Sequence, residues 1–310
     1  MQEIIRNRHM REAKINLRRL LRGRVDCDVS LSRFTSYRVG GPADLFIQPV
    51  DMDDLINLLG YLRQNAISRF IIGKGTNLLV HDRGYRGAVI FLGRTFRTVE
   101  VNKTIAVVQA GAQLGDFLAT LAENGLGGLE KLAGIPGSVG GAVYMNAGAF
   151  GSEIFDALVT VTVMEDSGQI VELPKSAIDF SYRHGLTDDQ GIILAAKFEL
   201  TLAEPVLLRK TMSEIWARRK AKQPLSYHSA GSVFKRPAGG FAGVYIEQAG
   251  LKGCRVGGAV VSTKHANFIL NKYHASAQNI FDLIQKVSDT VDKKFGVQLE
   301  KEIQLVGWNK

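Results

Sequence analysis

The chain has only two cysteines, Cys27 and Cys254, in 310 residues, and it has no long run of apolar side chains. Two thiols in a chain of this size imply no disulfide framework, so we interpret both as reduced, structural cysteines. An apolar run of ~20 residues is needed to span a bilayer, and none is present. The sequence therefore predicts a cytoplasmic, globular protein without a membrane span.

Aromatic side chains are missing from the most basic segment. Residues 1–24 hold seven Arg and one Lys against Glu3 and Glu12, so they carry +6 of the net charge of +9, and they contain no Phe, Tyr or Trp. Proteins that bind single-stranded nucleic acid interleave aromatic with basic side chains. We therefore interpret the segment as a solvated amphipathic helix, with a nucleic-acid or anionic-membrane surface as the alternative. Its predicted apolar stripe consists of Met10, Ala13, Leu17, Leu20 and Leu21.

Apolar periodicity predicts a mixture of helices and strands along the rest of the chain. Strand patterns cover 43–50, 69–72, 78–80, 88–92, 105–109 and 192–202, and a hairpin covers 159–173 with its turn at 166–168. One helix pattern begins at Asp51 and has Leu55, Leu58, Leu59 and Leu62 as its apolar face. Further helix patterns cover 114–123, 206–222, 243–249 and 278–295, and Gly296 ends the last of these helices. This order is typical of an α+β protein.

Two glycine-rich segments follow predicted strands. The first is Gly73-Lys74-Gly75-Thr76-Asn77, and the second, 126–151, contains eight glycines. Such loops can bring several backbone N–H groups against a phosphate because no Cβ blocks the approach, and two of them favour a dinucleotide with a pyrophosphate. The first loop lacks the third glycine of the Rossmann fingerprint and the earlier glycine of a P-loop. Glycines that merely serve tight turns are the alternative.

Nine strings in a fixed order carry a family resemblance. They are YRVGGPADLF (37–46), GKGTNLLV (73–80), GIPGSVGGAVYMNAGAFG (134–151), YRHG (182–185), RRKAKQP (218–224), SAGSVFKRP (229–237), AGLKGCRVGGAVVS (249–262), HANFILN (265–271) and LEKEI (299–303). Together they resemble the UDP-N-acetylenolpyruvoylglucosamine reductase (MurB) family from about residue 30 onward. The short spacing between YRHG and SAGS resembles its compact subtype.

The resemblance implies an FAD-binding module of the vanillyl-alcohol-oxidase-like (PCMH) type plus a C-terminal α+β substrate-binding domain. We expect a basic helix at 1–30, the FAD-binding domain at 31–203 and the substrate domain at 204–310, with the last strand, about 297–310, able to return to the FAD domain. The implied reaction is NADPH-dependent, FAD-mediated reduction of the enolpyruvyl ether of UDP-N-acetylglucosamine in peptidoglycan synthesis. A monomer without a nucleic-acid partner is expected. The alternative is another FAD-dependent oxidoreductase with the same module, such as an alcohol oxidase.

The resemblance assigns the chemistry to Arg183, Ser232 and Glu302. Reduction leaves enolate-like charge that the protein must stabilise before it supplies a proton. Arg183 can hold a planar carboxylate or enolate through its fork of donors, and an ordinary surface salt bridge is its alternative. Ser232 is the expected proton donor, with Lys235 or Lys222 increasing its acidity, and the alternative is a serine that bonds its own loop backbone.

Glu302 lies in 297–306, where odd positions are mostly apolar and even positions mostly polar. This alternation predicts a half-buried strand with Glu300, Glu302 and Gln304 on one face. The pattern alone does not choose between the two glutamates. The resemblance chooses Glu302 because it is the last Glu of LEKEI.

The binding residues are also implied by the resemblance. Cofactor contacts are expected from Gly73, Lys74, Gly75, Thr76, Asn77, Ile135, Pro136, Gly137, Ser138, Gly140, Gly141, Asn146, Gly148 and Arg219. Substrate contacts are expected from Tyr182, Lys222, Lys235, Arg236, His265 and Asn267. No metal site is expected, and His81 and His184 receive no role. Gly185 and His228 depart from the family pattern, and since neither is one of the three catalytic positions, the departures concern fine specificity rather than the reaction.

Overall fold

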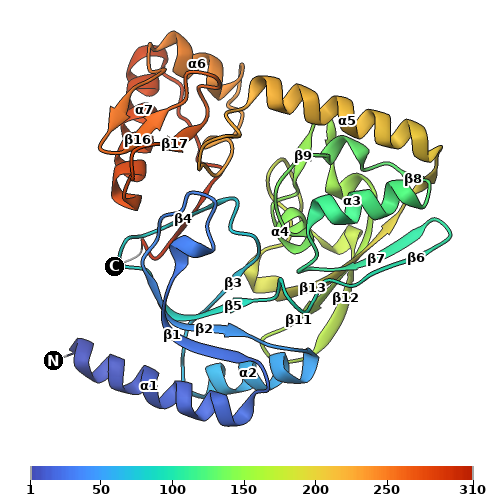
Figure 1. The fold of residues 1–310 in the computed structure, drawn as a ribbon, viewed down its shortest axis with the longest axis vertical. Helices are drawn as coiled ribbons and strands as arrows, with labels where there is room; N and C mark the ends of the chain where they lie inside the picture. Colours follow the sequence, from blue (N-terminus) through green and yellow to red (C-terminus); the bar gives the residue numbers. More distant parts are fainter. Residues whose placement is uncertain (1, 309–310) are drawn as a thin grey trace. The chain divides into compact units, whose positions relative to one another are not determined.

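The computed structural model describes residues 2–308, without the side chains of residues 2–8 and 188. The chain forms two units, each built from segments that are distant in the sequence (Figure 1). Unit 1 consists of Met1–Cys27, Leu45–Lys74 and Gly87–Arg219, and unit 2 consists of Asp28–Asp44, Gly75–Arg86 and Lys220–Lys310.

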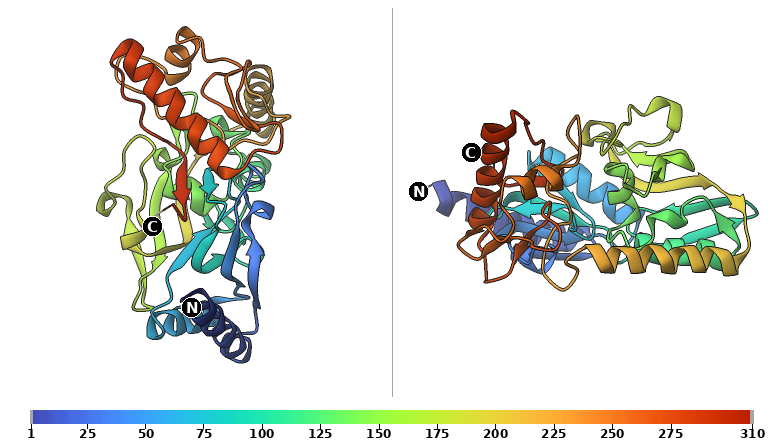
Figure 2. Two further views of the ribbon diagram at one scale, coloured as in Figure 1. Left: turned by 90° about the vertical axis from the view of Figure 1, so that its left-hand side faces the viewer. Right: turned by 90° about the horizontal axis from the view of Figure 1, so that it is seen from above.

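Two helices and a four-stranded sheet form one part of unit 1. The helices α1 (Gln2–Leu20) and α2 (Met52–Gln64) lie side by side (Figures 1 and 2). The sheet has the order β1 (Arg24–Ser30), β2 (Pro42–Gln48), β5 (Tyr85–Phe91), β3 (Arg69–Ile72), with β3 parallel to β5, and the unit boundaries fall within β1, β2 and β5. Its core contains Ala13, Leu17, Leu21, Leu55, Leu58, Leu59 and Leu62, as the two helical stripes predict. Leu20 was placed wrongly on that stripe, because its side chain is 44% exposed.

A five-stranded antiparallel sheet forms the other part of unit 1. Its order is β12 (Ile170–Pro174), β11 (Leu158–Met164), β13 (Ile192–Glu199), β7 (Ile105–Gln109), β6 (Val99–Asn102). The sheet shares a core with α3 (Leu114–Glu123) and α4 (Val139–Tyr144), through Phe117, Leu121, Val139, Val143, Val161 and Phe198 among others. The remaining elements are α5 (Pro205–Lys222), the strand pairs β8 (Leu126–Gly127) with β14 (Thr201–Leu202) and β9 (Gly148–Ala149) with β10 (Ser152–Glu153), and short 3-10 turns at Glu130–Leu132, Ile154–Asp156, Lys175–Ala177 and Asp188–Gln190.

Unit 2 has its own core around α7 (Ala277–Phe295). This helix packs on a small sheet of β15 (Arg255–Val256), β16 (Ala259–Val261) and β17 (Ile269–Asn271). Ser276 caps α7 at its start, and Gly296 with φ +66° ends it, which is the left-handed conformation that glycine adopts without strain. The unit also contains α6 (Ala242–Gln248), a 3-10 turn at Leu31–Arg33, and β4 (Leu78–Val80) parallel to β18 (Gln304–Val306).

The predicted strand over 297–306 is wrong in its extent. Only β18 (Gln304–Val306) is a strand, and residue 301 makes one isolated antiparallel bridge with Phe234. The backbone before β18 instead bonds a loop, with Lys235 N–H donating to the Glu300 carbonyl and Glu302 N–H donating to the Val233 carbonyl. No helix within residues 2–308 combines the length and apolarity that a membrane crossing requires.

Candidate active site

The first glycine loop divides between the two units after Lys74. In unit 1, a Cβ on Gly73 would lie 2.2 Å from Ser138 Oγ, so the two predicted loops touch at these residues. Lys74 Nζ donates to Gln113 Oε1. In unit 2, Gly75 has φ +63°, and a Cβ there would lie 1.9 Å from the Phe34 carbonyl oxygen. A side chain at either glycine would therefore force a neighbouring segment away.

The second glycine loop is shaped by close packing as well as by turns. Ser138 caps α4 by accepting from Gly141 N–H at 3.2 Å. A Cβ on Gly140 would lie 2.8 Å from the Ala110 Cβ, so this glycine allows α4 to approach the strand end. The Gly137 carbonyl accepts from Leu114 N–H at 3.0 Å. Close packing against Ala110 therefore accounts for Gly140 without any ligand, and this reason differs from the tight turns that the sequence offered as the alternative.

Arg183 is held by a hairpin of the same unit. Its Nη2 donates to the Gly148 carbonyl at 2.7 Å, and its guanidinium lies 4.8 Å from the centroid of the Tyr182 ring. The side chain of Asn146, which is fully buried, fixes this hairpin by donating to Glu153 Oε2 at 2.7 Å and to the Ser181 carbonyl at 3.0 Å. Asn146 therefore connects the hairpin with the segment that carries Arg183, whatever further contact it makes with a cofactor.

The backbone around Arg183 is strained. Asn146, Phe150 and Arg183 all have positive φ, at +41°, +53° and +58°. Within residues 2–308, eight non-glycine residues have positive φ, and these are three of them. Left-handed backbone is costly for side chains other than glycine and, to a lesser degree, asparagine. Such strain persists where the surrounding structure requires a particular side chain, which is characteristic of functional sites.

Arg219 is a buried cation near Arg183. Only 8% of it is exposed, and its Nε makes no hydrogen bond within the described residues. Burial, and to a lesser degree the nearby charge of Arg183, lowers the pKa of Arg219. Its stem packs against the second loop, since a Cβ on Gly134 would lie 2.9 Å from Arg219 Cδ. Two neighbouring guanidiniums with an unpartnered buried donor suit an anionic ligand such as a diphosphate or a carboxylate.

Ser232 and Glu302 lie on adjacent segments of unit 2. Glu302 N–H donates to the carbonyl of Val233 at 2.8 Å, and the Asn77 amide donates to the Glu302 carbonyl at 3.0 Å. Ser232 is half-buried and follows Gly231, whose φ is +78°. Its hydroxyl makes no hydrogen bond within residues 2–308, which does not favour the alternative of a serine bonded to its own loop.

Two predicted substrate residues have structural partners next to Ser232. Asn267, which is 7% exposed, accepts from Phe234 N–H at 3.0 Å and donates to the Phe234 carbonyl at 2.8 Å. Lys235 Nζ forms a 2.7 Å ion pair with Glu300. The structure thus gives both residues a role in holding the loop, and their predicted contacts with substrate stay predictions.

The other predicted substrate residues are placed as follows. Arg236 lies over the Phe241 ring at 4.3 Å, and Lys222 is the exposed last residue of α5. His265 contacts Phe268 and has a buried Nδ1 without a partner in the described part of the chain. Burial, with the charge of Lys252 adding to it, lowers the pKa of His265, so its imidazole is neutral near pH 7.

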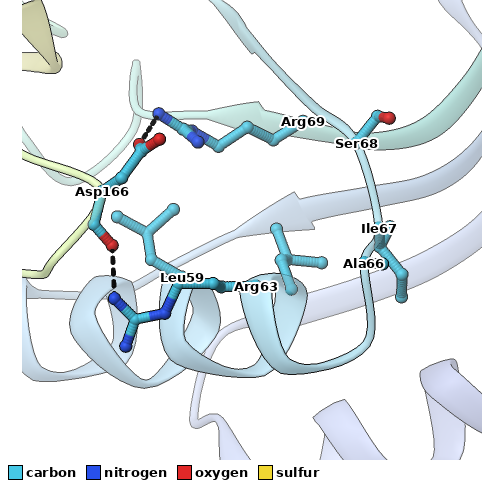
Figure 3. A pocket seen from close by; sticks show the side chains of 8 residues that line it. Leu59, Arg63, Ala66, Ile67, Ser68, Arg69 and Asp166 are labelled. Carbon is cyan, nitrogen blue, oxygen red and sulfur yellow. Dashed lines mark hydrogen bonds and ion pairs between the residues drawn. The ribbon is translucent and has the colours of Figure 1, made fainter. Parts of the chain in front are cut away.

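A cavity of about 280 Å³ in unit 1 contains none of the predicted site residues (Figure 3). It lies between α2, β3 and the turn of the β11–β12 hairpin. Arg63 donates to the Asp166 carbonyl at 2.9 Å, and Arg69 forms an ion pair with the Asp166 carboxylate. Both cations already have partners in the wall of the cavity, so we propose no ligand for it. Among the side chains that the structure describes, no cluster of His, Cys, Asp and Glu could hold a metal ion.

Sequence reasoning did not single out Glu153 or Phe150. Glu153 bonds Asn146, and the Phe150 ring lies beside Arg218 and Arg219. Both lie in or directly beyond the glycine-rich string that ends at Gly151, which is the signal that could have indicated them.

Two family models match parts of the chain. Residues 223–306 match the model of the UDP-N-acetylenolpyruvoylglucosamine reductase C-terminal domain, and residues 43–174 match that of an FAD binding domain. A UDP-N-acetylenolpyruvoylglucosamine reductase of Caldanaerobacter subterraneus subsp. tengcongensis is 44% identical over 93% of this chain and 95% of its own. That of Limosilactobacillus fermentum is 45% identical over 89% of this chain and 92% of its own. The predicted fold class is confirmed.

A solved structure gives the same result at the level of the fold. The crystal structure of UDP-N-acetylenolpyruvylglucosamine reductase (MurB) from Thermus caldophilus superimposes with a TM-score of 0.80 and 34% identity. The match covers 92% of this chain and 99% of the other.

Proposed function

The chain belongs to the UDP-N-acetylenolpyruvoylglucosamine reductase family, and on this premise we propose which of its residues carry out the reaction. The enzyme is an FAD-dependent UDP-N-acetylmuramate dehydrogenase, which reduces UDP-N-acetylglucosamine enolpyruvate in peptidoglycan synthesis. NADPH is the reducing co-substrate, and bound FAD supplies hydride to the enolpyruvyl group. The roles of individual residues are our proposal.

Arg219 is proposed to hold the diphosphate of FAD. The support is its buried, unpartnered Nε beside a second guanidinium, because an anion there would relieve both desolvation and like-charge repulsion. Backbone groups of the two glycine loops, around Gly73 and Ser138, would contact the same cofactor. The other predicted cofactor residues keep the assignment that the family resemblance gives them.

Arg183 is proposed to stabilise the enolate-like charge that reduction creates. Its fork of donors matches a carboxylate or enolate, and the Gly148 carbonyl already fixes one of its nitrogens. A guanidinium fixed before the reaction needs no reorganisation as the charge develops.

Ser232 is proposed to donate the proton to the carbon next to the carboxylate, and Glu302 to act beside it. The observation that carries this pairing is the hydrogen bond from Glu302 N–H to the Val233 carbonyl, since it places the two residues on neighbouring segments. A protonated Glu302 carboxyl can donate to a developing oxyanion. Lys235, or Lys222, would increase the acidity of the serine, although the ion pair with Glu300 offsets part of the Lys235 charge.

We also propose that Tyr182, Lys222, Lys235, Arg236, His265 and Asn267 bind the UDP-sugar, whose diphosphate attracts cations. The functional division into a basic N-terminal segment at 1–30, an FAD domain at 31–203 and a substrate domain at 204–310 belongs to the same proposal, although the expected helix over 1–30 is too long, because α1 ends at Leu20 and residues 24–30 form β1. We further propose that the protein is a monomer, that it is located in the cytoplasm and that it has no nucleic-acid partner.

The two half-reactions test the proposed chemistry. Without oxygen, NADPH should bleach the yellow flavin of the purified protein, and UDP-N-acetylglucosamine enolpyruvate should restore the colour. UDP-N-acetylglucosamine, which lacks the enolpyruvyl group, is the matched control and should leave the flavin reduced. A protein without flavin, or one whose reduced flavin responds to both sugars alike, would contradict the proposal.

A further inference from the structure

The tip of the β9–β10 hairpin carries a bulky residue where the backbone suits asparagine or glycine. Ala149 pairs with Ser152, so Phe150 and Gly151 are the two central residues of a tight turn. Both have positive φ, at +53° and +76°, as a type I′ turn requires. Phenylalanine is strained in this conformation, and asparagine followed by glycine is the preferred pair. The stability of the turn therefore does not explain Phe150.

Burial does not explain it either. The Phe150 side chain is 41% exposed, so the ring is not a core residue. Its contacts are with cations instead: the guanidinium carbon of Arg218 lies 4.8 Å from the ring centroid, and that of Arg219 lies 5.7 Å from it. Both distances are within the range of a cation–π interaction. The strained residue thus contacts two consecutive arginines at the end of α5.

The same hairpin also contacts Arg183. The Gly148 carbonyl accepts from Arg183 Nη2 at 2.7 Å, and a Cβ on Gly148 would lie 3.2 Å from Arg183 Nη1. One short hairpin therefore touches Arg183 with its backbone and Arg219 with its aromatic side chain. A cation that is buried without a hydrogen bond on Nε needs such a neighbour to keep one orientation.

We propose that Phe150 is a positioning residue whose ring holds the guanidinium of Arg219, with that of Arg218 beside it, in place for the diphosphate of FAD. The proposal rests on the proposed role of Arg219 as a cofactor contact. Strain at the turn persists because an aromatic face is needed at this point, and no residue that relaxes the turn offers one.

The test is the rate at which FAD leaves the purified holoenzyme, followed as flavin fluorescence after dilution. Phe150→Asn relaxes the turn and removes the ring, and we expect FAD release about tenfold faster, since lost affinity appears mainly in the dissociation rate. Phe150→Tyr keeps an aromatic face and should stay within about twofold of the wild type. Arg219→Met should also accelerate release, and Phe150→Asn should add little to it, because the two act through one contact.

Lys103 offers the matched control. It is an exposed residue with φ +53° at the tip of the β6–β7 hairpin, so Lys103→Asn relieves the same left-handed backbone strain at a single hairpin residue without removing a ring. FAD release should not change. Unchanged release from Phe150→Asn, or faster release from Phe150→Tyr, would overturn the proposal for Phe150. Unchanged release from Arg219→Met in an enzyme that still turns over would instead overturn the proposed role of Arg219.

Discussion

The backbone N–H of Glu302 donates a 2.8 Å hydrogen bond to the carbonyl oxygen of Val233, the residue that follows Ser232. Two proposed catalytic side chains from distant parts of the sequence are therefore positioned by main-chain atoms. Asn77 extends the arrangement, because its amide donates to the Glu302 carbonyl and its own carbonyl accepts from Gln304 N–H at 2.9 Å. Since main-chain atoms form these bonds, substitution of Ser232 should leave the loop in place.

Substitution of Ser232 should separate the two half-reactions. In Ser232→Ala, NADPH should still reduce the flavin at the wild-type rate, while oxidation of reduced flavin by the enolpyruvyl substrate slows about 10²–10⁴-fold, the usual contribution of a general acid. Rapid-mixing absorbance measurements follow each step. Ser229→Ala, on the same loop, is the control and should change neither rate by more than a few-fold. Equal losses in both half-reactions of Ser232→Ala would mean that the serine is structural.

Asn267 should contribute to stability more than an ordinary surface amide. Asn267→Leu leaves the N–H and C=O of Phe234, a fully packed residue, without their partners. Each unsatisfied buried group costs about 1–3 kcal/mol, so with two such groups we expect the free energy of unfolding to fall by about 2–6 kcal/mol. Urea unfolding measures the change. Asn124→Ala removes an exposed bond to the Thr120 carbonyl and should cost less than about 0.5 kcal/mol.

Asp54 should make the stability of unit 1 depend on pH. Its buried carboxylate accepts from the backbone N–H groups of Arg22, Gly23 and Val50 at 3.0, 2.8 and 3.1 Å. Burial by itself raises the pKa of Asp54, but these bonds and the charge of Arg22 outweigh it, so the folded pKa is lowered. The stabilisation is therefore present above the unfolded pKa of about 3.9 and is lost as the pH falls below it.

Unfolding experiments at several pH values check this expectation. Asp54→Asn should destabilise the protein by about 1–3 kcal/mol at pH 7, and the difference from the wild type should shrink between about pH 4 and pH 2. Asp53→Asn, an exposed neighbour in the first turn of α2, is the control and should cost about 0.3–1 kcal/mol. A difference between Asp54→Asn and the wild type that does not change with pH would contradict the assigned cause.

Local sequence pattern predicted the elements whose side chains repeat regularly. The strands at 69–72, 78–80 and 105–109 and the helix at 114–123 have the predicted bounds. In the helix the buried residues repeat with the helical period, whereas 69–72 and 78–80 are short, mostly apolar runs. The strands β1 and β6 were missed, although Val25, Cys27 and Val29, and Val99 and Val101, alternate along them. Charged residues between these positions weakened the pattern.

The candidate site depended more on long-range contacts than on pattern. The alternation over 297–306 predicted one strand, but the backbone of Glu300 and Glu302 bonds a loop some 65 residues earlier in the chain, between Val233 and Lys235. No local period encodes such a partner. Likewise, the glycine-rich string indicated a functional loop, but neither the cation contacts of Phe150 nor the bond from Asn146 to Glu153 can be derived from residue spacing.

Asn146 and Glu153 provide a test of how the Arg183 hairpin is fixed. The Asn146 amide donates to both Glu153 Oε2 and the Ser181 carbonyl. Asn146→Asp would replace this donating NH₂ group with a carboxylate oxygen, which would then face the two accepting oxygens without a hydrogen between them. We expect a loss of about 2–4 kcal/mol in the free energy of unfolding, or protonation of the introduced carboxyl group, together with a lower kcat because Arg183 loses its fixed position. Asn102→Asp at the exposed end of β6 is the control and should change stability by about 0.5 kcal/mol or less.

In the double variant Asn146→Asp, Glu153→Gln, the new glutamine amide can donate to the new carboxylate, so part of the stability and of kcat should return. If the double variant is no better than Asn146→Asp alone, the bond between these two side chains does not hold the hairpin, and the position of Arg183 must depend on the Ser181 contact instead.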